Sequence, residues 1–214
     1  MPPRLHNIVS YSVAALVFAG VAGLCSGRAS GATQFAFLGA AMWCVHFARR
    51  TFESAFVHRY ARPAIPIADV AIEYVYYWGF AVWNALSLFS SDYQPRWSLL
   101  VWPGVLVFAL AELGNAMCHV MLRELRASDS QARAMPRGFL FEWVSCPHYL
   151  FEILSWLGFA MAVQTWAALC FALLGAGILA FWARTRHAAY KKDFDGVTRE
   201  LYPAARRALV PFVF

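Results

Sequence analysis

The sequence predicts an all-α protein, a polytopic integral membrane bundle of about six transmembrane helices that forms a single domain over residues 1–214. Composition is the first observation behind this prediction, because 61% of the residues are hydrophobic and only 14% are charged, which is unusual for a water-soluble domain. The second is a series of long apolar segments, several of which approach or exceed the ~20 residues that cross a ~30 Å hydrocarbon core. These segments cover residues 8–26, 33–48, 66–90, 97–122, 148–165 and 166–183.

The distribution of positive charge is the third observation. If the segments alternate across the membrane from an inside N-terminus, all of the 18 lysines and arginines except Arg28 and Arg96 fall on one face. The positive-inside rule makes that face cytoplasmic, so both termini are predicted to be cytoplasmic. The net charge of +6 therefore reflects topology, and no nucleic-acid partner is expected. The first segment lacks a clear cleavage pattern and is interpreted as a retained helix rather than a signal peptide.

The segments outside the apolar runs lie mostly on the predicted cytoplasmic face. Residues 49–63 place Phe52, Phe56 and Tyr60 at helical spacing, which predicts an amphipathic helix in the membrane interface. Residues 123–138 form a polar, arginine-rich loop. The tail after Arg184 ends in "ALVPFVF", which is too apolar for a solvated tail and is predicted to pack back under the bundle.

A polar stripe runs along the fourth apolar segment. Its members recur every three or four residues, and they are Glu112, Asn115, His119, Arg123 and Arg126. Ionisable groups at membrane depth are costly and usually face a bundle interior or a wet cavity, which favours a ligand pocket. The alternative is a set of hydrogen bonds between helices that specify packing.

Ser145, Cys146 and Pro147 directly precede the fifth segment. Ser145 is a candidate N-cap and Pro147 is tolerated in the first turn, so the helix is expected to begin near Cys146. The N-terminus of a buried helix attracts an anion such as a phosphate. His148 and Tyr149 follow directly, which places polar groups beside that predicted anion site.

Other polar residues leave two interpretations open. The third segment carries Glu73 and then Tyr74, Tyr76 and Tyr77, which line a cavity or belong to an aromatic belt at the membrane surface. The chain also contains Cys/His pairs, but none has the spacing of a zinc finger, so no metal site is predicted. The five cysteines are odd in number and mostly lie in apolar segments, which argues against a disulfide framework.

Several blocks together resemble the steroid 5-alpha-reductase family, and most closely its trans-2-enoyl-CoA reductase branch. These blocks are "ESAFVHRYARP", "YYWGFAVW", "LGNAMCHVMLRELR", "GFLFEWVSCPHYLFEILSWLGFA", "WARTRHAAYKKDF" and "ALVPFVF", in an order that covers about residue 45 to the end. The resemblance implies a membrane reductase that uses NADPH to reduce a carbon–carbon double bond conjugated to a carbonyl. The implied substrate is lipid-like, either a trans-2-enoyl-CoA or a 3-oxo-4-ene steroid.

The resemblance also implies roles for individual residues. Tyr149 matches the proposed proton donor, in "CPHY" where the branch has "CPNY", and Glu152 matches an acid that orders the site. The predicted cofactor-binding set combines the family positions with Arg123 of the polar stripe, and it comprises Asn115, His119, Arg123, Arg126, His148, Arg186, His187, Tyr190 and Arg206. Arginine suits the phosphates because a planar guanidinium binds phosphate oxygens bidentately.

The sequence departs from the steroid reductases where they bind the substrate carbonyl. Ser10 and Tyr11 lie near the expected acid of the early helix, and Phe47 stands where a tyrosine is expected. The chain is also expected to lack the family's first span or N-terminal extension. Tyr11 is therefore a third catalytic candidate, in competition with Tyr149 and the tyrosines of the third segment.

Two other functions compete with a reductase. One is a methyltransferase of the isoprenylcysteine type, although the tail lacks the acidic pair that such enzymes place after their last span. The other is a non-catalytic lipid-binding or assembly protein. The predicted location is a bacterial inner membrane, or the endoplasmic reticulum for a eukaryotic host, with the cofactor site facing the cytoplasm and an unknown oligomeric state.

Overall fold

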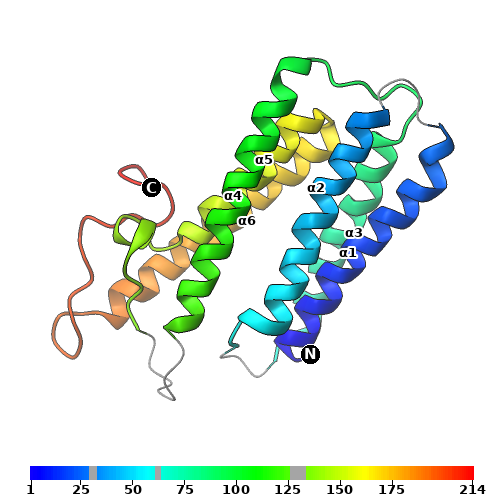
Figure 1. The fold of residues 1–214 in the computed structure, drawn as a ribbon. Coiled ribbons are helices and arrows are strands. Elements are labelled where there is room, and N and C mark those ends of the chain that lie inside the picture. The colour runs from blue at the N-terminus through cyan, green and yellow to red at the C-terminus, as the bar shows by residue number, and fades with distance from the viewer. Residues whose placement is uncertain (29–32, 61–63, 126–133) are drawn as a thin grey trace.

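The chain folds into a helical bundle, which we describe from a computed structural model of residues 1–214 without residues 29–32, 61–63 and 126–133 (Figure 1). The long helices are α1 (Pro3–Cys25), α2 (Thr33–Phe52), α3 (Ile67–Leu88), α4 (Ser98–Glu124), α5 (Pro147–Val163) and α6 (Trp166–Asp193). Short helical turns cover Ser26–Arg28, Glu53–Val57 and Phe139–Glu142. The six predicted apolar segments thus each correspond to a helix, and the described residues contain no β-strand, only two isolated bridges.

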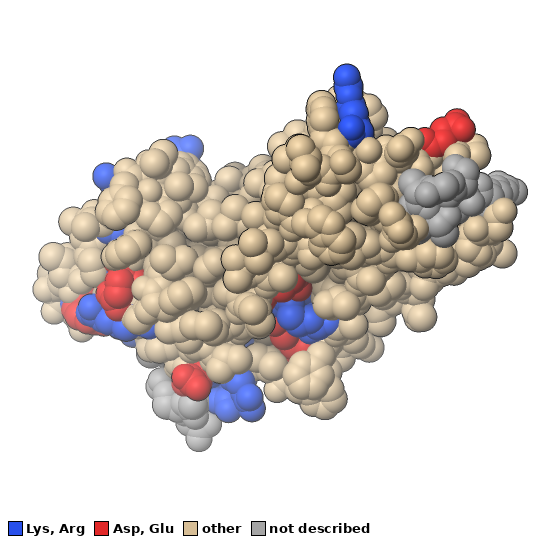
Figure 2. Space-filling view, turned by 45° about the horizontal axis from the view of Figure 1, so that its top comes forward, with Lys and Arg blue, Asp and Glu red and all other residues tan. Residues whose placement is uncertain are grey.

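The helices form an integral membrane protein. Three of them, α1, α4 and α6, are long and apolar enough to cross a bilayer by length and composition. Helix α5 has 17 residues, which corresponds to about 25 Å at 1.5 Å per residue and falls slightly short of a full span. The face drawn in Figure 2 is mostly uncharged, as a lipid-facing surface requires. The number of crossings and the cytoplasmic side of the termini stay predictions.

The helices are arranged in two groups of three. Helix α1 packs against α2 and α3, while α5 packs against α4 and α6. Contacts from α2 to α5 and from α3 to α6 join the two groups (Figure 1). The closest approach is between α4 and α5, where Gly104 and Gly158 bring the two backbones together, and a Cβ at Gly158 would lie 2.6 Å from the Phe108 nitrogen.

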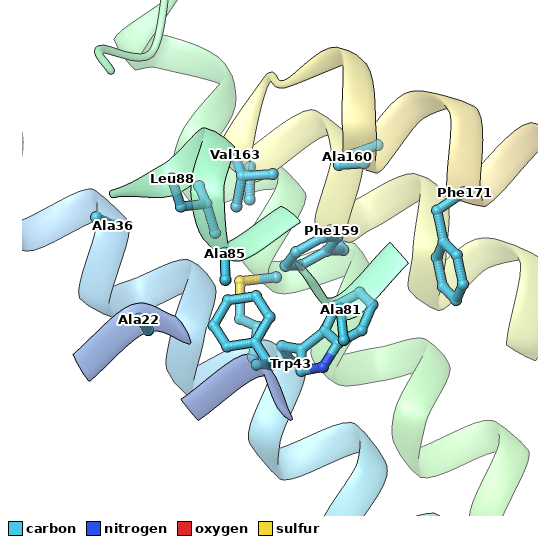
Figure 3. Close-up of a cluster of buried hydrophobic side chains, with 14 of the residues drawn as sticks. Ala22, Ala36, Trp43, Ala81, Ala85, Leu88, Phe159, Ala160, Val163 and Phe171 are labelled. Atoms are coloured by element: carbon cyan, nitrogen blue, oxygen red, sulfur yellow. The ribbon is translucent and has the colours of Figure 1, made fainter. Parts of the chain in front are cut away.

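An aromatic core fills the middle of the bundle (Figure 3). Trp43 of α2 is fully buried and its ring lies 5.2 Å from that of Phe18 and 5.3 Å from that of Phe171, measured between centroids. Its indole N–H donates to the Ala14 carbonyl oxygen across 3.3 Å, so the one polar atom of the side chain is satisfied. Small residues such as Ala81 let the helices approach these rings.

The C-terminal tail packs under the bundle, as predicted from its apolar sequence. The backbone N–H groups of Ser145 and Cys146 donate to the carbonyl oxygens of Arg207 and Ala208 at 2.8 and 3.2 Å. Ala208 and Leu209 are buried beside Cys146. The tail thus occupies backbone donors at the start of α5.

Two local predictions were wrong. Residues 49–63 do not form a separate amphipathic helix, because α2 continues to Phe52 and then makes a π-helical turn over Glu53–Val57. Its expected end near Pro63 lies outside the described residues. Ser145 is not the N-cap of α5 either: the cap position is Cys146, without a side-chain cap, and the Ser145 hydroxyl binds the tail instead. The helix still begins near Cys146, as expected.

Candidate functional site

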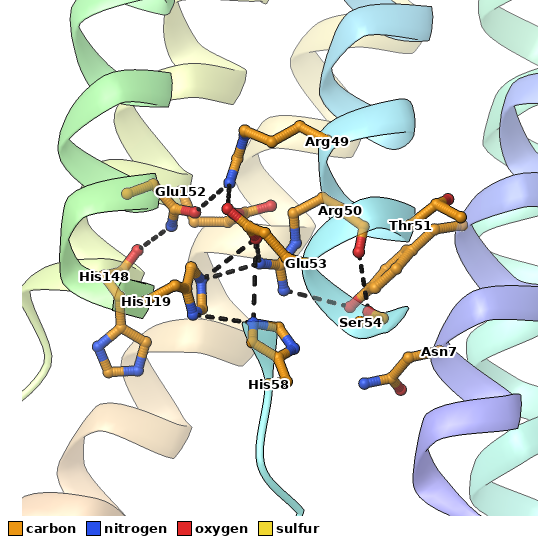
Figure 4. A network of polar contacts seen from close by, with 12 residues as sticks. Asn7, Arg49, Arg50, Thr51, Glu53, Ser54, His58, His119, His148 and Glu152 are labelled. Atoms are coloured by element: carbon orange, nitrogen blue, oxygen red, sulfur yellow. Dashed lines mark hydrogen bonds and ion pairs between the residues drawn. The ribbon is translucent and has the colours of Figure 1, made fainter. Parts of the chain in front are cut away.

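A network of charged side chains lies at the end of the bundle where α2 and α4 finish and α5 begins (Figure 4). Its centre is His46 of α2, which is 1% exposed. The His46 Nδ1 atom lies 2.8 Å from Glu112 Oε1 of α4, and its Nε2 atom lies 3.2 Å from Glu152 Oε1 of α5. Arg49 Nε donates to the other Glu112 oxygen across 2.7 Å. One imidazole and one guanidinium therefore link three helices.

Glu53 forms the second centre of this network. Its carboxylate accepts from Arg49 and from Arg50, whose Nη1 lies 2.6 Å from Oε2. The same Arg50 nitrogen lies 2.8 Å from His119 Nε2, and His119 Nδ1 lies 3.1 Å from His58 Nε2. Glu53 is only 4% exposed, so its two arginine contacts compensate a buried charge.

Asn115 connects the network to the start of α5. Its side-chain oxygen accepts from Arg49 Nη1 at 2.8 Å, and its Nδ2 donates to the backbone oxygen of His148 at 2.7 Å. The His148 ring packs against the rings of Tyr149 and His119, with centroid distances of 4.2 and 5.7 Å. His148 Nδ1 is buried and has no hydrogen-bond partner among the described residues.

A second polar cluster lies beneath α5, between the end of α6 and the C-terminal tail. We call it the tail cluster, and it comprises Ser145, His187, Tyr190 and Tyr202. The Ser145 hydroxyl lies 2.6 Å from His187 Nδ1 and 2.7 Å from the Tyr202 hydroxyl. Tyr202 stacks on Tyr190, with ring centroids 5.8 Å apart and an interplanar angle of 5°. These contacts fasten the tail to both helices.

Arg206 holds the outer part of the tail. It is 2% exposed, and it donates to the Pro136 carbonyl oxygen at 2.9 Å and to Glu142 Oε2 at 3.0 Å. The pKa of Glu142 is lowered, first by the hydrogen bond from the Gly138 N–H and then by Arg206. Burial raises the pKa of the Cys146 thiol to about 12, which argues against a nucleophilic thiolate there.

His148 and Tyr149 lie between the network and the tail cluster. The Tyr149 ring lies 6.4 Å from the Trp182 ring of α6, measured between centroids, while the backbone of His148 is held by Asn115. The two residues therefore connect the interior of the bundle with the segment that closes it from below.

The structure brings together many of the predicted residues. The network contains Asn115, His119 and Glu152, and Tyr11 joins it through a 3.4 Å contact between its hydroxyl and Arg50 Nη2. The tail cluster and its surroundings contain His187, Tyr190, Arg206 and, beside Tyr149, Arg186. Arg123 is exposed at the end of α4. Arg126 lies outside the described residues.

Sequence reasoning missed several members of the network. Arg49 and Arg50 were attributed to membrane topology, and His46, Glu53 and His58 were given no role. A signal was present, because Glu53 follows the two arginines at spacings of four and three residues, where side chains on one helical face meet. The contacts of His46 with α4 and α5 could not be read from this local spacing.

One group of side chains has the ligand types of a metal site. Single ligand atoms of Glu53, His58 and His119 lie within 4.8 Å of one another. Both oxygens of Glu53 already pair with arginines, and Arg50 also contacts His119. A cation would have to displace or approach a guanidinium, so this geometry favours an ion-pair network.

Comparison with known proteins identifies the family. Residues 63–214 match the family model described as 3-oxo-5-alpha-steroid 4-dehydrogenase. The chain belongs to this family, the steroid 5-alpha-reductase family. This confirms the resemblance that the sequence blocks indicated.

The individual relatives are named as enoyl-CoA reductases or as a steroid dehydrogenase. The chain is 37% identical over 171 residues to a very-long-chain enoyl-CoA reductase of Dictyostelium discoideum, covering 80% of this chain and 56% of that protein. It is 35% identical over 190 residues to a probable very-long-chain enoyl-CoA reductase of Caenorhabditis elegans, covering 85% and 59%. It is 31% identical over 176 residues to 3-oxo-5-alpha-steroid 4-dehydrogenase 2 of Sus scrofa, covering 81% and 66%. The matches thus span between half and two thirds of each relative.

Proposed function

We propose that the protein is a membrane-embedded reductase that uses NADPH to reduce a carbon–carbon double bond conjugated to a carbonyl. The observation that carries the proposal is the position of His148 and Tyr149 between the charged network and the tail cluster. Family membership and the names of the relatives support the same reaction class. The relatives named as enoyl-CoA reductases favour an enoyl thioester over a 3-oxo-4-ene steroid as the substrate.

The residues at this junction fit a phosphorylated nicotinamide cofactor. Buried polar atoms without a partner among the described residues include His148 Nδ1, Arg49 Nη2 and Arg206 Nε, so donors are left over for a ligand. The proposed binding set remains the one expected from the sequence, with Arg49 added. When bound, NADPH supplies the hydride. Within this set, Arg206 is proposed to bind the cofactor through its Nε atom, because its Nη1 and Nη2 atoms already donate to Pro136 and Glu142.

Tyr149 is the proposed proton donor. Its ring is packed against that of His148, and the positive charge of Arg186 acts on its phenol. A positive charge beside the phenol stabilises the phenolate that remains after the proton is transferred to the substrate α-carbon. Glu152 is proposed to order the start of α5, since it binds His46 and also accepts from Trp156 Nε1 at 3.2 Å.

Tyr11 is proposed to polarise the substrate carbonyl. Its ring lies 6.1 Å from that of Phe47 and 5.6 Å from that of Tyr77, and Arg50 contacts its hydroxyl. A donor at this position would stabilise the enolate oxygen that develops during reduction. Tyr77 is the alternative donor, because its ring lies 5.5 Å from that of Phe47, the residue that lacks a hydroxyl.

The deciding experiment is to purify the protein in detergent and follow NADPH absorbance. We expect NADPH to be consumed with a trans-2-enoyl-CoA, and more slowly or not at all with a 4-ene-3-ketosteroid. If NADPH neither binds nor is consumed with either substrate, the reductase proposal is wrong. Lipid binding without NADPH consumption would favour the non-catalytic alternative.

Substitutions then separate the proposed roles. Tyr149→Phe should abolish turnover and leave NADPH affinity nearly unchanged, whereas Tyr93→Phe, in the loop between α3 and α4, should retain turnover. Retained turnover in Tyr149→Phe would remove this residue from proton transfer. Arg126→Ala and Arg206→Ala should raise the KM for NADPH, while Arg137→Ala, whose side chain pairs with Glu200 on the surface, should not. Of Tyr11→Phe and Tyr77→Phe, the one with the larger loss of kcat identifies the carbonyl donor.

A further inference from the structure

His46 occupies an unusual position for a histidine inside a membrane protein. The ring is 1% exposed and lies 4.3 Å from the Trp156 ring and 5.1 Å from the Phe47 ring, measured between centroids. Both of its polar edges nevertheless face carboxylates from other helices, Glu112 of α4 and Glu152 of α5. Water has little access to this ring, so its partners determine its protonation.

With Glu112 and Glu152 both ionised, hydrogen-bond accounting requires two protons on the ring. The atoms that face the ring nitrogens are Glu112 Oε1 at 2.8 Å and Glu152 Oε1 at 3.2 Å. An ionised carboxylate only accepts, so each ring nitrogen of His46 must donate. A neutral imidazole carries one N–H, and it would leave one nitrogen lone pair directed at a carboxylate oxygen.

Charge balance gives the same answer. The acids of the network are Glu53, Glu112 and Glu152, and its arginines are Arg49 and Arg50. Their side chains are at most 17% exposed, so solvent compensates little of their charge. With all three acids ionised, a charged His46 and the two arginines make three cations for three carboxylates, whereas a neutral His46 leaves one carboxylate more than the arginines.

His119, in the same network, has the opposite environment. Its Nε2 atom lies 2.8 Å from Arg50 Nη1, which can only donate, so this histidine nitrogen must accept. His119 therefore carries a proton on Nδ1 alone and is neutral. Two histidines of the same network are thus held in different protonation states by their partners.

We propose that His46 is a permanent imidazolium that neutralises the network and acts as a positioning residue. By holding Glu152 it fixes the first turns of α5, and with them His148 and Tyr149, against α2. The charged and titratable groups around it are Arg49 and Arg50 of α2, Glu112 of α4 and Glu152 of α5. The protonation state follows from these contacts alone, while the effect on turnover rests on the proposed reductase function.

A nitrogen NMR experiment tests the protonation state directly. The whole protein would be labelled with 15N-histidine, purified in detergent at about pH 7.5, and assigned with His46→Gln and His119→Gln. An ordinary histidine with a pKa near 6.5 is mostly neutral at this pH. We expect both ring nitrogens of His46 to carry protons, and one nitrogen of His119 to be unprotonated. A neutral His46 overturns the proposal.

A charge-balance experiment tests the role in the folded protein. His46→Gln leaves the two carboxylates without their shared cation and is expected to lower the melting temperature by about 10 °C. The double variant His46→Gln with Glu152→Gln removes one charge of each sign, and we expect it to recover at least half of that loss. A double variant that is less stable than His46→Gln contradicts the charge-balance proposal, as does an unchanged melting temperature in the single variant.

Kinetics separate positioning from stability alone. At a temperature where His46→Gln is folded, its kcat should fall at least tenfold while its KM for NADPH changes little, because the residue acts through Glu152 and α5. An unchanged kcat would show that His46 has no positioning role. If the wild-type protein does not reduce either substrate, the proposed function fails, and the NMR and melting experiments still decide the protonation of His46.

Discussion

Helix α2 contributes to two adjoining regions that are held together by different forces. Around Trp43 the bundle is an apolar core of aromatic rings and alanines. Three residues later, around His46, it is a network of ion pairs that reaches α4 and α5. The first region depends on shape, because dispersion and burial are lost wherever a cavity opens. The second depends on charge, because one missing partner leaves a buried ion uncompensated.

The largest effect is expected from a substitution that prevents the bundle from folding, so that both regions are lost. Gly158→Leu places a side chain against the backbone of α4, where even a Cβ lies 2.6 Å from the Phe108 nitrogen and 2.8 Å from the Gly104 oxygen. Backbone atoms cannot move aside cheaply, so we expect no folded monodisperse protein by size-exclusion chromatography. Gly79→Ala, where a Cβ meets nothing within 4 Å, should fold normally. A well-folded Gly158→Leu would contradict this packing of α4 on α5.

The second-largest effect is expected when side-chain volume is removed from the apolar region. Trp43→Ala should lower the free energy of unfolding by about 3–5 kcal/mol, since it opens a cavity among the rings of Phe18, Phe159 and Phe171. Trp102→Ala is the matched control, because its side chain is 66% exposed on the bundle surface. The comparison is made by thermal or denaturant unfolding in the same detergent. Equal effects of the two substitutions would rule out Trp43 as a packing centre.

The third-largest effect is expected when one negative charge is removed from the network with little change in side-chain shape. Glu112→Gln should cost about 3 kcal/mol, because His46 and Arg49 each lose the negative charge that they bind. Glu124→Gln, at the exposed end of α4, should cost close to nothing. Unfolding measured at low and high salt adds a second test. The cost at Glu112 should persist at high salt, since buried pairs are poorly screened.

A smaller effect is expected in the tail cluster, where the contacts are hydrogen bonds between mostly neutral groups. Ser145→Ala removes the hydroxyl that lies against His187 and Tyr202, and we expect a loss of about 1–3 kcal/mol. Hydrogen exchange of the tail amides should also accelerate. Ser87→Ala, which removes a hydroxyl that, among the described residues, bonds only to the Trp83 carbonyl oxygen within α3, is the control. Unchanged exchange in the tail would show that the cluster does not fasten it.

The smallest effect concerns Asp195, in the exposed turn after α6. Its carboxylate accepts from the backbone N–H groups of Val197 and Thr198 at 2.9 Å each, and these bonds lower its pKa to about 2. The native pKa is below the unfolded value of about 3.9, so the stabilisation is present above that value and is lost as the pH falls toward 2. A carboxyl 13C NMR titration measures the pKa. A midpoint near 3.9 would contradict the turn geometry.

Much of the fold was predictable because it depends on local composition. The apolar segments identified the six long helices of the described residues, and the apolar ending "ALVPFVF" indicated a tail that packs under the bundle. Of the polar stripe on α4, Glu112, Asn115 and His119 take part in the network, whereas Arg123 is exposed. The Ser145 cap was predicted wrongly, because a serine before a helix has competing partners that only the folded tail supplies.

The sequence by itself determined the class of the molecule: a membrane-embedded helical bundle of the steroid 5-alpha-reductase family, with polar groups at the start of α5. The length of the hydrophobic segments and the order of the motifs are properties of the sequence, so they can be recognised without the structure. Only the tertiary structure decided the partners of these groups, because Glu112, Glu152 and His46 lie on three helices and meet only after packing. The energy of a buried charge depends on such distant neighbours, which is why Arg49 and Arg50 resembled topology signals until the structure placed Glu53 and Glu112 against them.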